Sequence, residues 1–116
     1  MRLYLFRHGE VERSDLFFGQ YDNPLNEQGE RQSDAIARYV SELDVAAIYT
    51  SDLGRAAEAG RRVSKALGLP FMQEARLREI HLGWADGLPH EQAFERDPEL
   101  REARMEWLVE RPLTEG

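Results

Sequence analysis

The chain has 116 residues, which suits one domain rather than two, because soluble domains commonly contain about 100 to 200 residues. Its 15 lysines and arginines are outnumbered by 22 aspartates and glutamates, and the resulting net charge of −7 argues against broad binding to nucleic acid or anionic lipid. The lack of cysteine excludes disulfides and thiolate sites within the chain, and the lack of a long apolar run or a signal-peptide pattern predicts a soluble, cytoplasmic protein.

The first part of the chain predicts a strand followed by a helix. Residues 3–6 form a short apolar run that stops at Arg7, as expected for a buried strand that leads into a polar loop. Turn-forming residues follow, and Asn26 is a suitable N-cap for a helix over residues 27–43. Apolar side chains recur there at helical spacing and predict one buried face, formed by Ala35, Ile36, Tyr39, Val40 and Leu43.

The middle of the chain predicts a second strand, a second helix and a third strand. Residues 45–49 are short and apolar, and a helix that starts near Asp52 follows them. Gly68 is placed to cap this helix at its carboxyl end, and residues 69–73 form the third strand. The buried face of the helix is predicted from small and apolar residues at helical spacing, namely Ala56, Gly60, Val63 and Leu67.

The order strand, helix, strand, helix, strand predicts an α/β fold with a mainly parallel sheet. Parallel sheets bind ligands beyond the carboxyl ends of their strands, so residues 7–10 and 50–55 belong to the expected functional edge, with residues 77–88 as a third loop. Asp97 and Pro98 are typical of a helix start. The apolar stripe of this last predicted helix consists of Leu100, Ala103, Trp107 and Leu108, before Pro112.

The segment Arg7-His8-Gly9-Glu10 contains the residue types that phosphoryl transfer requires. A neutral imidazole nitrogen can attack phosphorus, a guanidinium can stabilise the equatorial oxygens, and glycine allows close approach of the backbone. A single histidine beside a strand also serves as a structural hydrogen-bonding residue in many proteins. The tetrapeptide alone leaves both interpretations open.

Five segments in the same order resemble the histidine phosphatase superfamily, the phosphoglycerate mutase-like enzymes. They are Arg7-His8-Gly9-Glu10, the stretch from Gly19 to Gly29, Tyr49-Thr50-Ser51-Asp52-Leu53-Gly54-Arg55-Ala56, Ala66-Leu67-Gly68-Leu69-Pro70, and the stretch from Leu77 to Gly87. Together with the apolar run before Arg7, they lie within residues 3 to 88. The short first loop and Glu10-Val11-Glu12 favour the branch of α-ribazole phosphatases and broad-specificity phosphatases. The resemblance implies a three-layer α/β sandwich.

The resemblance also implies a role for each matching residue. His8 would be the nucleophile that becomes phosphohistidine, Arg7 and Arg55 would hold the transferring phosphoryl group, and Glu79 would protonate the leaving oxygen. Ser14 would replace a polar phosphate contact of the first loop. No metal or other cofactor is required, the substrate would be a small phosphorylated metabolite, and His81 and His90 would be structural or exposed.

The main departure from the family pattern is length. Family members are longer and contain a second histidine, carried by a later strand and followed by glycine, which this chain does not supply after Trp84. Residues 1–116 would then be the amino-terminal part of one phosphatase domain or, less favoured, a natural short relative. A parallel sheet that lacks a strand leaves an unpaired edge, which a carboxyl-terminal segment or a second copy of the chain would cover.

Several functions therefore remain open. The main interpretation is a phosphomonoester hydrolase with a phosphohistidine intermediate, and the alternatives are mutase-type phosphoryl transfer and a non-catalytic phosphate-binding module. A metal-dependent hydrolase built on His8, His81, Glu79 and Asp86 is the weakest, because the sequence has no pair of histidines at helical spacing.

Overall fold

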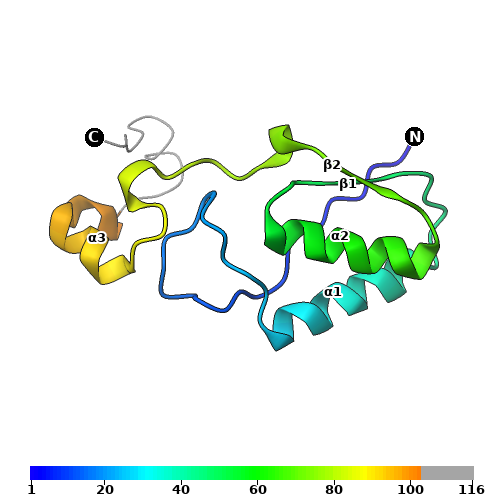
Figure 1. The fold of residues 1–116 in the computed structure, drawn as a ribbon, viewed down its shortest axis with the longest axis horizontal. Helices are drawn as coiled ribbons and strands as arrows, with labels where there is room; N and C mark the ends of the chain where they lie inside the picture. Colours follow the sequence, from blue (N-terminus) through cyan, green and yellow to red (C-terminus); the bar gives the residue numbers. More distant parts are fainter. Residues whose placement is uncertain (103–116) are drawn as a thin grey trace. The chain divides into compact units, whose positions relative to one another are not determined.

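The computed structural model describes residues 1–102, which form two compact units (Figure 1). The first unit contains Met1–Glu12 and Asp22–Arg78. The second contains Arg13–Tyr21 and the described part of Glu79–Gly116. Each unit is therefore built from two stretches of chain, which are separated by residues 13–21 in the first unit and by residues 22–78 in the second.

The first unit consists of two helices and a parallel pair of short strands. In chain order these are α1 (Glu27–Val40), β1 (Ile48–Thr50), α2 (Gly54–Leu67) and β2 (Phe71–Gln73). In the register of the sheet, Ile48 is opposite Phe71 and Tyr49 is opposite Met72. The predicted α/β fold with a parallel sheet is confirmed, although both strands are shorter than predicted.

The predicted first strand is wrong for the described residues. Residues 3–6 adopt no strand, and Leu3 and Leu5 are 75% and 83% exposed. Their apolar composition favours an extended backbone, but a strand forms only when a neighbouring strand accepts and donates its backbone hydrogen bonds. Within residues 1–102 the sheet has two strands, β1 and β2, and neither pairs with this segment.

Helix α1 begins where the sequence predicts. The Asn26 side chain accepts a hydrogen bond from the Gly29 N–H at 2.8 Å, as an N-cap does. The helix ends at Val40 rather than residue 43, and its buried face includes Ala37 and Val40. Ala35 and Tyr39 were predicted to be buried, but both are exposed, because the face that packs in the unit is rotated from the predicted one.

Helix α2 matches its predicted face closely. Gly60 and Val63 are buried, and Gly68 caps the helix with a left-handed backbone at φ 67°. A Cβ on Gly60 would lie 2.1 Å from the Thr50 side chain, so glycine lets α2 pack tightly on β1. The core between the helices and the sheet contains Ala37, Val40 and Val63, with Ile36, Val45, Ile48 and Leu67 packed around them.

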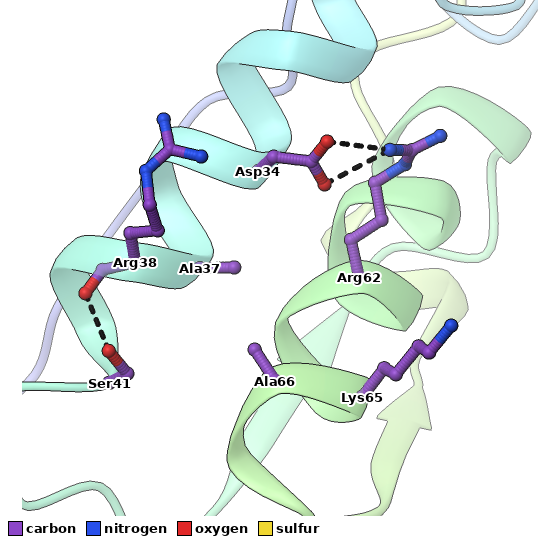
Figure 2. Close-up of a pocket in the computed structure, with 7 residues that line it drawn as sticks. All are labelled: Asp34, Ala37, Arg38, Ser41, Arg62, Lys65 and Ala66. Carbon is purple, nitrogen blue, oxygen red and sulfur yellow. Dashed lines mark hydrogen bonds and ion pairs between the residues drawn. The ribbon is translucent and has the colours of Figure 1, made fainter.

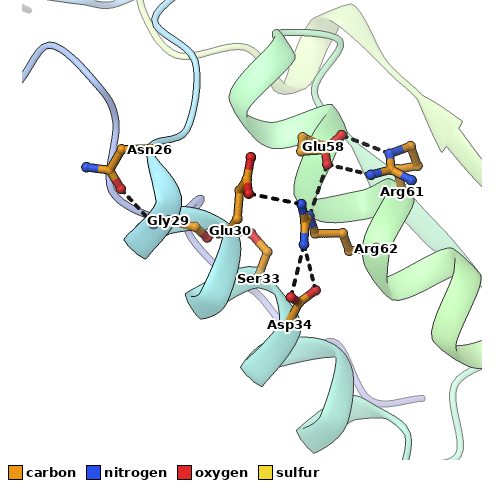
Figure 3. A network of polar contacts seen from close by, with 8 residues as sticks. All are labelled: Asn26, Gly29, Glu30, Ser33, Asp34, Glu58, Arg61 and Arg62. Atoms are coloured by element: carbon orange, nitrogen blue, oxygen red, sulfur yellow. Dashed lines mark hydrogen bonds and ion pairs between the residues drawn. The ribbon is translucent and has the colours of Figure 1, made fainter.

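A network of charged groups links α1 to α2 (Figure 3). Arg62 donates to both carboxylate oxygens of Asp34 at 3.0 Å, and its other nitrogens lie 3.4 Å from Glu30 and 3.0 Å from Glu58. Arg61 also pairs with Glu58. Because the Arg62 side chain is 21% exposed, its three acidic partners balance a charge that is largely removed from water.

The second unit is organised around a small apolar core. Helix α3 (His90–Arg96) was not predicted, and 3-10 turns cover Gly83–Ala85 and Pro98–Glu102. Ala85, Ala93 and Leu100 form the core, with Phe17, Trp84 and Phe94 packed around it. The Asp97 side chain accepts from the Glu99 N–H, as predicted for a cap, but Ala103, Trp107, Leu108 and Pro112 of the predicted last helix lie outside the described residues. No helix among residues 1–102 has the length and apolar character needed to cross a membrane.

Candidate active site

The loop that carries His8 fixes the tautomer of the histidine ring. His8 is half-buried, and its Nδ1 lies 2.7 Å from the Gly9 carbonyl oxygen. A carbonyl oxygen only accepts hydrogen bonds, so Nδ1 carries the proton in the neutral ring. The lone pair is then on Nε2, the nitrogen that can act as a nucleophile toward phosphorus.

The same loop is held against the first turn of α1. A Cβ on Gly9 would lie 2.5 Å from the Gly29 carbonyl oxygen, and a Cβ on Gly29 would lie 2.0 Å from the Glu10 carbonyl oxygen. The two glycines therefore allow direct contact between backbones, which a larger residue at either position would prevent. The consequence is that the position of His8 depends on the amino terminus of α1.

Asn26 joins this loop to the helix through both ends of its amide. Its side-chain oxygen Oδ1 caps α1. Its Nδ2 donates to the Val11 carbonyl oxygen at 3.1 Å and to a Glu10 carboxylate oxygen at 3.2 Å. The Glu10 N–H donates to the Gln32 side chain at 2.8 Å, and its carbonyl oxygen accepts from the Asn26 N–H at 3.0 Å. These contacts fix the backbone directly after His8.

The two candidate phosphate-binding arginines both lie in the first unit. Arg7 is exposed beside His8 in sequence, whereas Arg55, in the first turn of α2, is 2% exposed. Arg55 is therefore not a solvated residue on the surface of its helix. A guanidinium removed from water needs polar partners, and Arg55 does interact with neighbouring groups.

The turn between β1 and α2 has fixed geometry near Arg55. The Ser51 hydroxyl oxygen accepts from the Leu53 N–H at 3.0 Å. Arg78 donates two hydrogen bonds of 2.6 Å to the Asp52 carboxylate, and this contact lowers the pKa of Asp52. Asp52 therefore remains charged at neutral pH and holds the start of the 77–88 loop.

The other two candidate residues, Glu79 and Ser14, belong to the second unit. Both are exposed. The Glu79 carboxylate accepts from the Ile80 N–H at 3.1 Å, and its backbone carbonyl oxygen accepts from Gln20 Nε2 at 3.2 Å. The structure thus places Arg7, His8 and Arg55 in one unit, and Glu79 and Ser14 in the other.

Asp86 has a structural role in the second unit that the sequence did not reveal. Its side chain is 5% exposed, and its carboxylate accepts from the N–H groups of Gly19, Gln20 and Tyr21 at 3.0, 2.8 and 3.0 Å. Burial by itself would raise the pKa of Asp86, but the backbone donors outweigh it and the pKa is lowered. His81 Nε2 lies 3.6 Å from the same carboxylate, and His81 Nδ1 accepts from the Gly83 N–H.

A surface groove between α1 and α2 contains none of the candidate catalytic residues (Figure 2). Asp34 and Arg62 meet across it, with Arg38 and Lys65 on its sides and Ala37 and Ala66 between them. In the part of the chain that the structure describes, no group of three or more His, Asp or Glu side chains is arranged to hold a metal ion.

Known proteins resemble this chain in sequence and in structure. The probable phosphoglycerate mutase GpmB of Serratia proteamaculans is 38% identical over 85 residues, which are 72% of this chain and 40% of the mutase. Mycobacterial glucosyl-3-phosphoglycerate phosphatase Rv2419c, solved in complex with inorganic phosphate, is 35% identical with a TM-score of 0.73, and the match covers 82% of this chain and 44% of that one. YhfR of Bacillus stearothermophilus is 37% identical with a TM-score of 0.75, and the match covers 79% and 46%.

These matches confirm the resemblance and set its extent. The match covers less than half the length of each of these three relatives. The model of the family described as histidine phosphatase superfamily (branch 1) matches residues 3–116, which is nearly the whole sequence. With the Arg-His-Gly loop, the α/β fold and the relatives in agreement, the chain belongs to branch 1 of the histidine phosphatase superfamily.

Proposed function

We propose that the protein hydrolyses a phosphomonoester of a small metabolite through a phosphohistidine at His8. The observation that supports this most is the hydrogen bond from His8 Nδ1 to the Gly9 carbonyl oxygen, since it leaves the lone pair on Nε2. The phosphatase Rv2419c, 35% identical over the matched part, supports the same class of reaction.

The proposed reaction has two steps. His8 Nε2 attacks phosphorus, the ester P–O bond breaks, and Glu79 gives its proton to the departing alcohol oxygen. Water then attacks the phosphohistidine, Glu79 takes a proton from that water, and the N–P bond breaks to release inorganic phosphate. Arg7 and Arg55 stabilise the charge on the equatorial oxygens, and Ser14 contributes a further polar contact.

The test is to trap the intermediate. The protein is incubated with a phosphomonoester labelled at phosphorus and quenched in alkali, and label that is lost in acid is expected on His8. The variant His8→Gln is expected to take up no label, while the matched control His90→Gln, which changes a histidine of α3, is expected to be labelled normally. Label on serine or aspartate, or full turnover by His8→Gln, would contradict the proposal.

Phosphoryl transfer to a second hydroxyl group is the other candidate, favoured by the relative named as a probable phosphoglycerate mutase. The two outcomes differ only in the acceptor that attacks phosphohistidine. Following the label into inorganic phosphate or into a second phosphate ester distinguishes hydrolase from mutase.

We also propose that the outer face of the β1–β2 sheet is covered by a partner surface. Tyr49 and Met72 are opposite each other in the register and are 62% and 45% exposed, whereas α2 packs on the other face. A segment following residue 116 or a second copy of the chain would bury them. Residues 1–116 alone are then expected to turn over p-nitrophenyl phosphate near the detection limit, and robust turnover by a monomer would contradict this.

A further inference from the structure

The second unit contains a chain of contacts from Asp86 through Gln20 to Glu79. Asp86 accepts hydrogen bonds from three successive N–H groups, those of residues 19–21, and its carboxylate is nearly removed from water. A fourth N–H, that of Leu82, lies 3.4 Å from the same carboxylate. The backbone of Gln20 is therefore fixed by an anion in the loop that follows Glu79.

The Gln20 side chain connects this fixed backbone to Glu79. Its Nε2 donates to the Glu79 carbonyl oxygen at 3.2 Å. Ile80, the residue after Glu79, is in close contact with Gly19, since a Cβ on Gly19 would lie 2.0 Å from the Ile80 carbonyl oxygen. The backbone of Glu79 and Ile80 is thus supported by two adjacent residues whose own positions depend on Asp86.

Backbone support matters at Glu79 because its side chain is exposed and is not fixed by packing. A general acid must reach the departing oxygen at hydrogen-bond distance, and an error of about 1 Å can lower the rate about 10²-fold. We propose that Gln20, held in place by Asp86, is a positioning residue for the general acid Glu79. This inference rests on the proposed function.

The experiment uses the dependence of the rate on the leaving group, in the full-length product of the gene. An alkyl phosphate needs a proton on its leaving oxygen, whereas p-nitrophenolate leaves without one. The variant Gln20→Met keeps the size of the side chain and removes the donor. Because Glu79 also acts in the hydrolysis of phosphohistidine, which both substrates share, the measured quantity is the single-turnover rate of phosphohistidine formation at His8. We expect Gln20→Met to lower this rate for the alkyl phosphate about 10- to 100-fold, with the half-saturating concentration changed less than about 2-fold, and to leave the rate for p-nitrophenyl phosphate within about 2-fold.

Companion variants separate positioning from folding. Gln92→Met is a matched control on the exposed surface of α3 and is expected to match the parent protein on both substrates. Asp86→Asn is expected to speed amide hydrogen exchange at Gly19, Gln20 and Tyr21 and to show the same substrate dependence, and Asp86→Glu is expected to restore part of the loss. In Gln20→Met these amides are expected to remain protected, because their acceptor is intact.

The outcomes distinguish this inference from the function on which it rests. If the parent protein forms no phosphohistidine and hydrolyses neither substrate, the proposed function fails and the positioning role fails with it. If the parent protein is active but Gln20→Met slows phosphohistidine formation equally from both substrates, or from neither, the function stands and the positioning role of Gln20 is refuted.

Discussion

Replacing Asn26 with alanine tests how the loop after His8 is attached to α1. The substitution removes the cap on the Gly29 N–H, which costs about 1 kcal/mol for a typical N-cap. It also removes the donor to the partly buried Val11 carbonyl oxygen, which contributes about 1 kcal/mol more. The exposed contact with Glu10 adds little. We therefore expect Asn26→Ala to lower the free energy of unfolding by about 2 kcal/mol.

The variant Asn26→Asp divides this total into its parts. Aspartate keeps an oxygen that caps Gly29, but it has no Nδ2 to donate to Val11 and it places a second carboxylate beside Glu10. We expect it to lose about 1 kcal/mol, roughly half of the alanine effect. Urea unfolding of both variants and the parent measures this. A loss below about 0.5 kcal/mol in Asn26→Ala, or equal losses in the two variants, would refute the reasoning.

Two further predictions concern backbone contact and acid stability. Gly9→Ala places a methyl group against the Gly29 backbone, so we expect it to lower the free energy of unfolding by about 1 to 3 kcal/mol and to impair labelling of His8. The control Gly68→Ala has open space around the new methyl group but keeps φ at 67°, so it is expected to cost about 1 kcal/mol and to leave labelling intact. Equal labelling in both variants would contradict this. A hydrogen bond from Arg61 lowers the pKa of Glu58 from 4.5 to about 2. We therefore expect the parent protein to have a higher free energy of unfolding than Glu58→Gln above pH 4.5, and this difference to disappear as the pH falls toward 2. A difference that does not depend on pH in this range would count against the prediction.

The elements that the sequence predicted well are those set by local contacts. Asn26 caps a helix that begins one residue later, and Gly68 ends another by adopting a positive φ, so both signals act within a few residues. The strand predicted at residues 3–6 failed for the opposite reason. Its existence depends on a hydrogen-bonding neighbour, and apolar composition carries no information about which neighbour is present.

The candidate site shows the same division. His8 and its neighbours could be identified from a contiguous motif, and the structure added the tautomer and the contact with Gly29. The role of Asp86 could not be predicted, since an acidic residue between alanine and glycine resembles an ordinary surface loop residue. Its partners at residues 19–21 lie more than 60 positions earlier, and only the folded chain brings them together.

The interleaving of the two units has a consequence for the order of folding during synthesis. Closing the chain between Gly19 and Asp86, 67 positions apart, costs about 4 kcal/mol in loop entropy if nothing else is formed. Residues 22–78 can fold before residue 86 leaves the ribosome. Folding brings the two ends of this segment to the turn between β1 and α2, because Asp22 lies against Gly54 and Arg78 pairs with Asp52. Folding of the first unit thus shortens the flexible loop between residues 19–21 and Asp86, and so lowers the entropy cost of forming their hydrogen bonds. Pulse-labelled amides in α1 and α2 should accordingly gain protection earlier than those of residues 19–21.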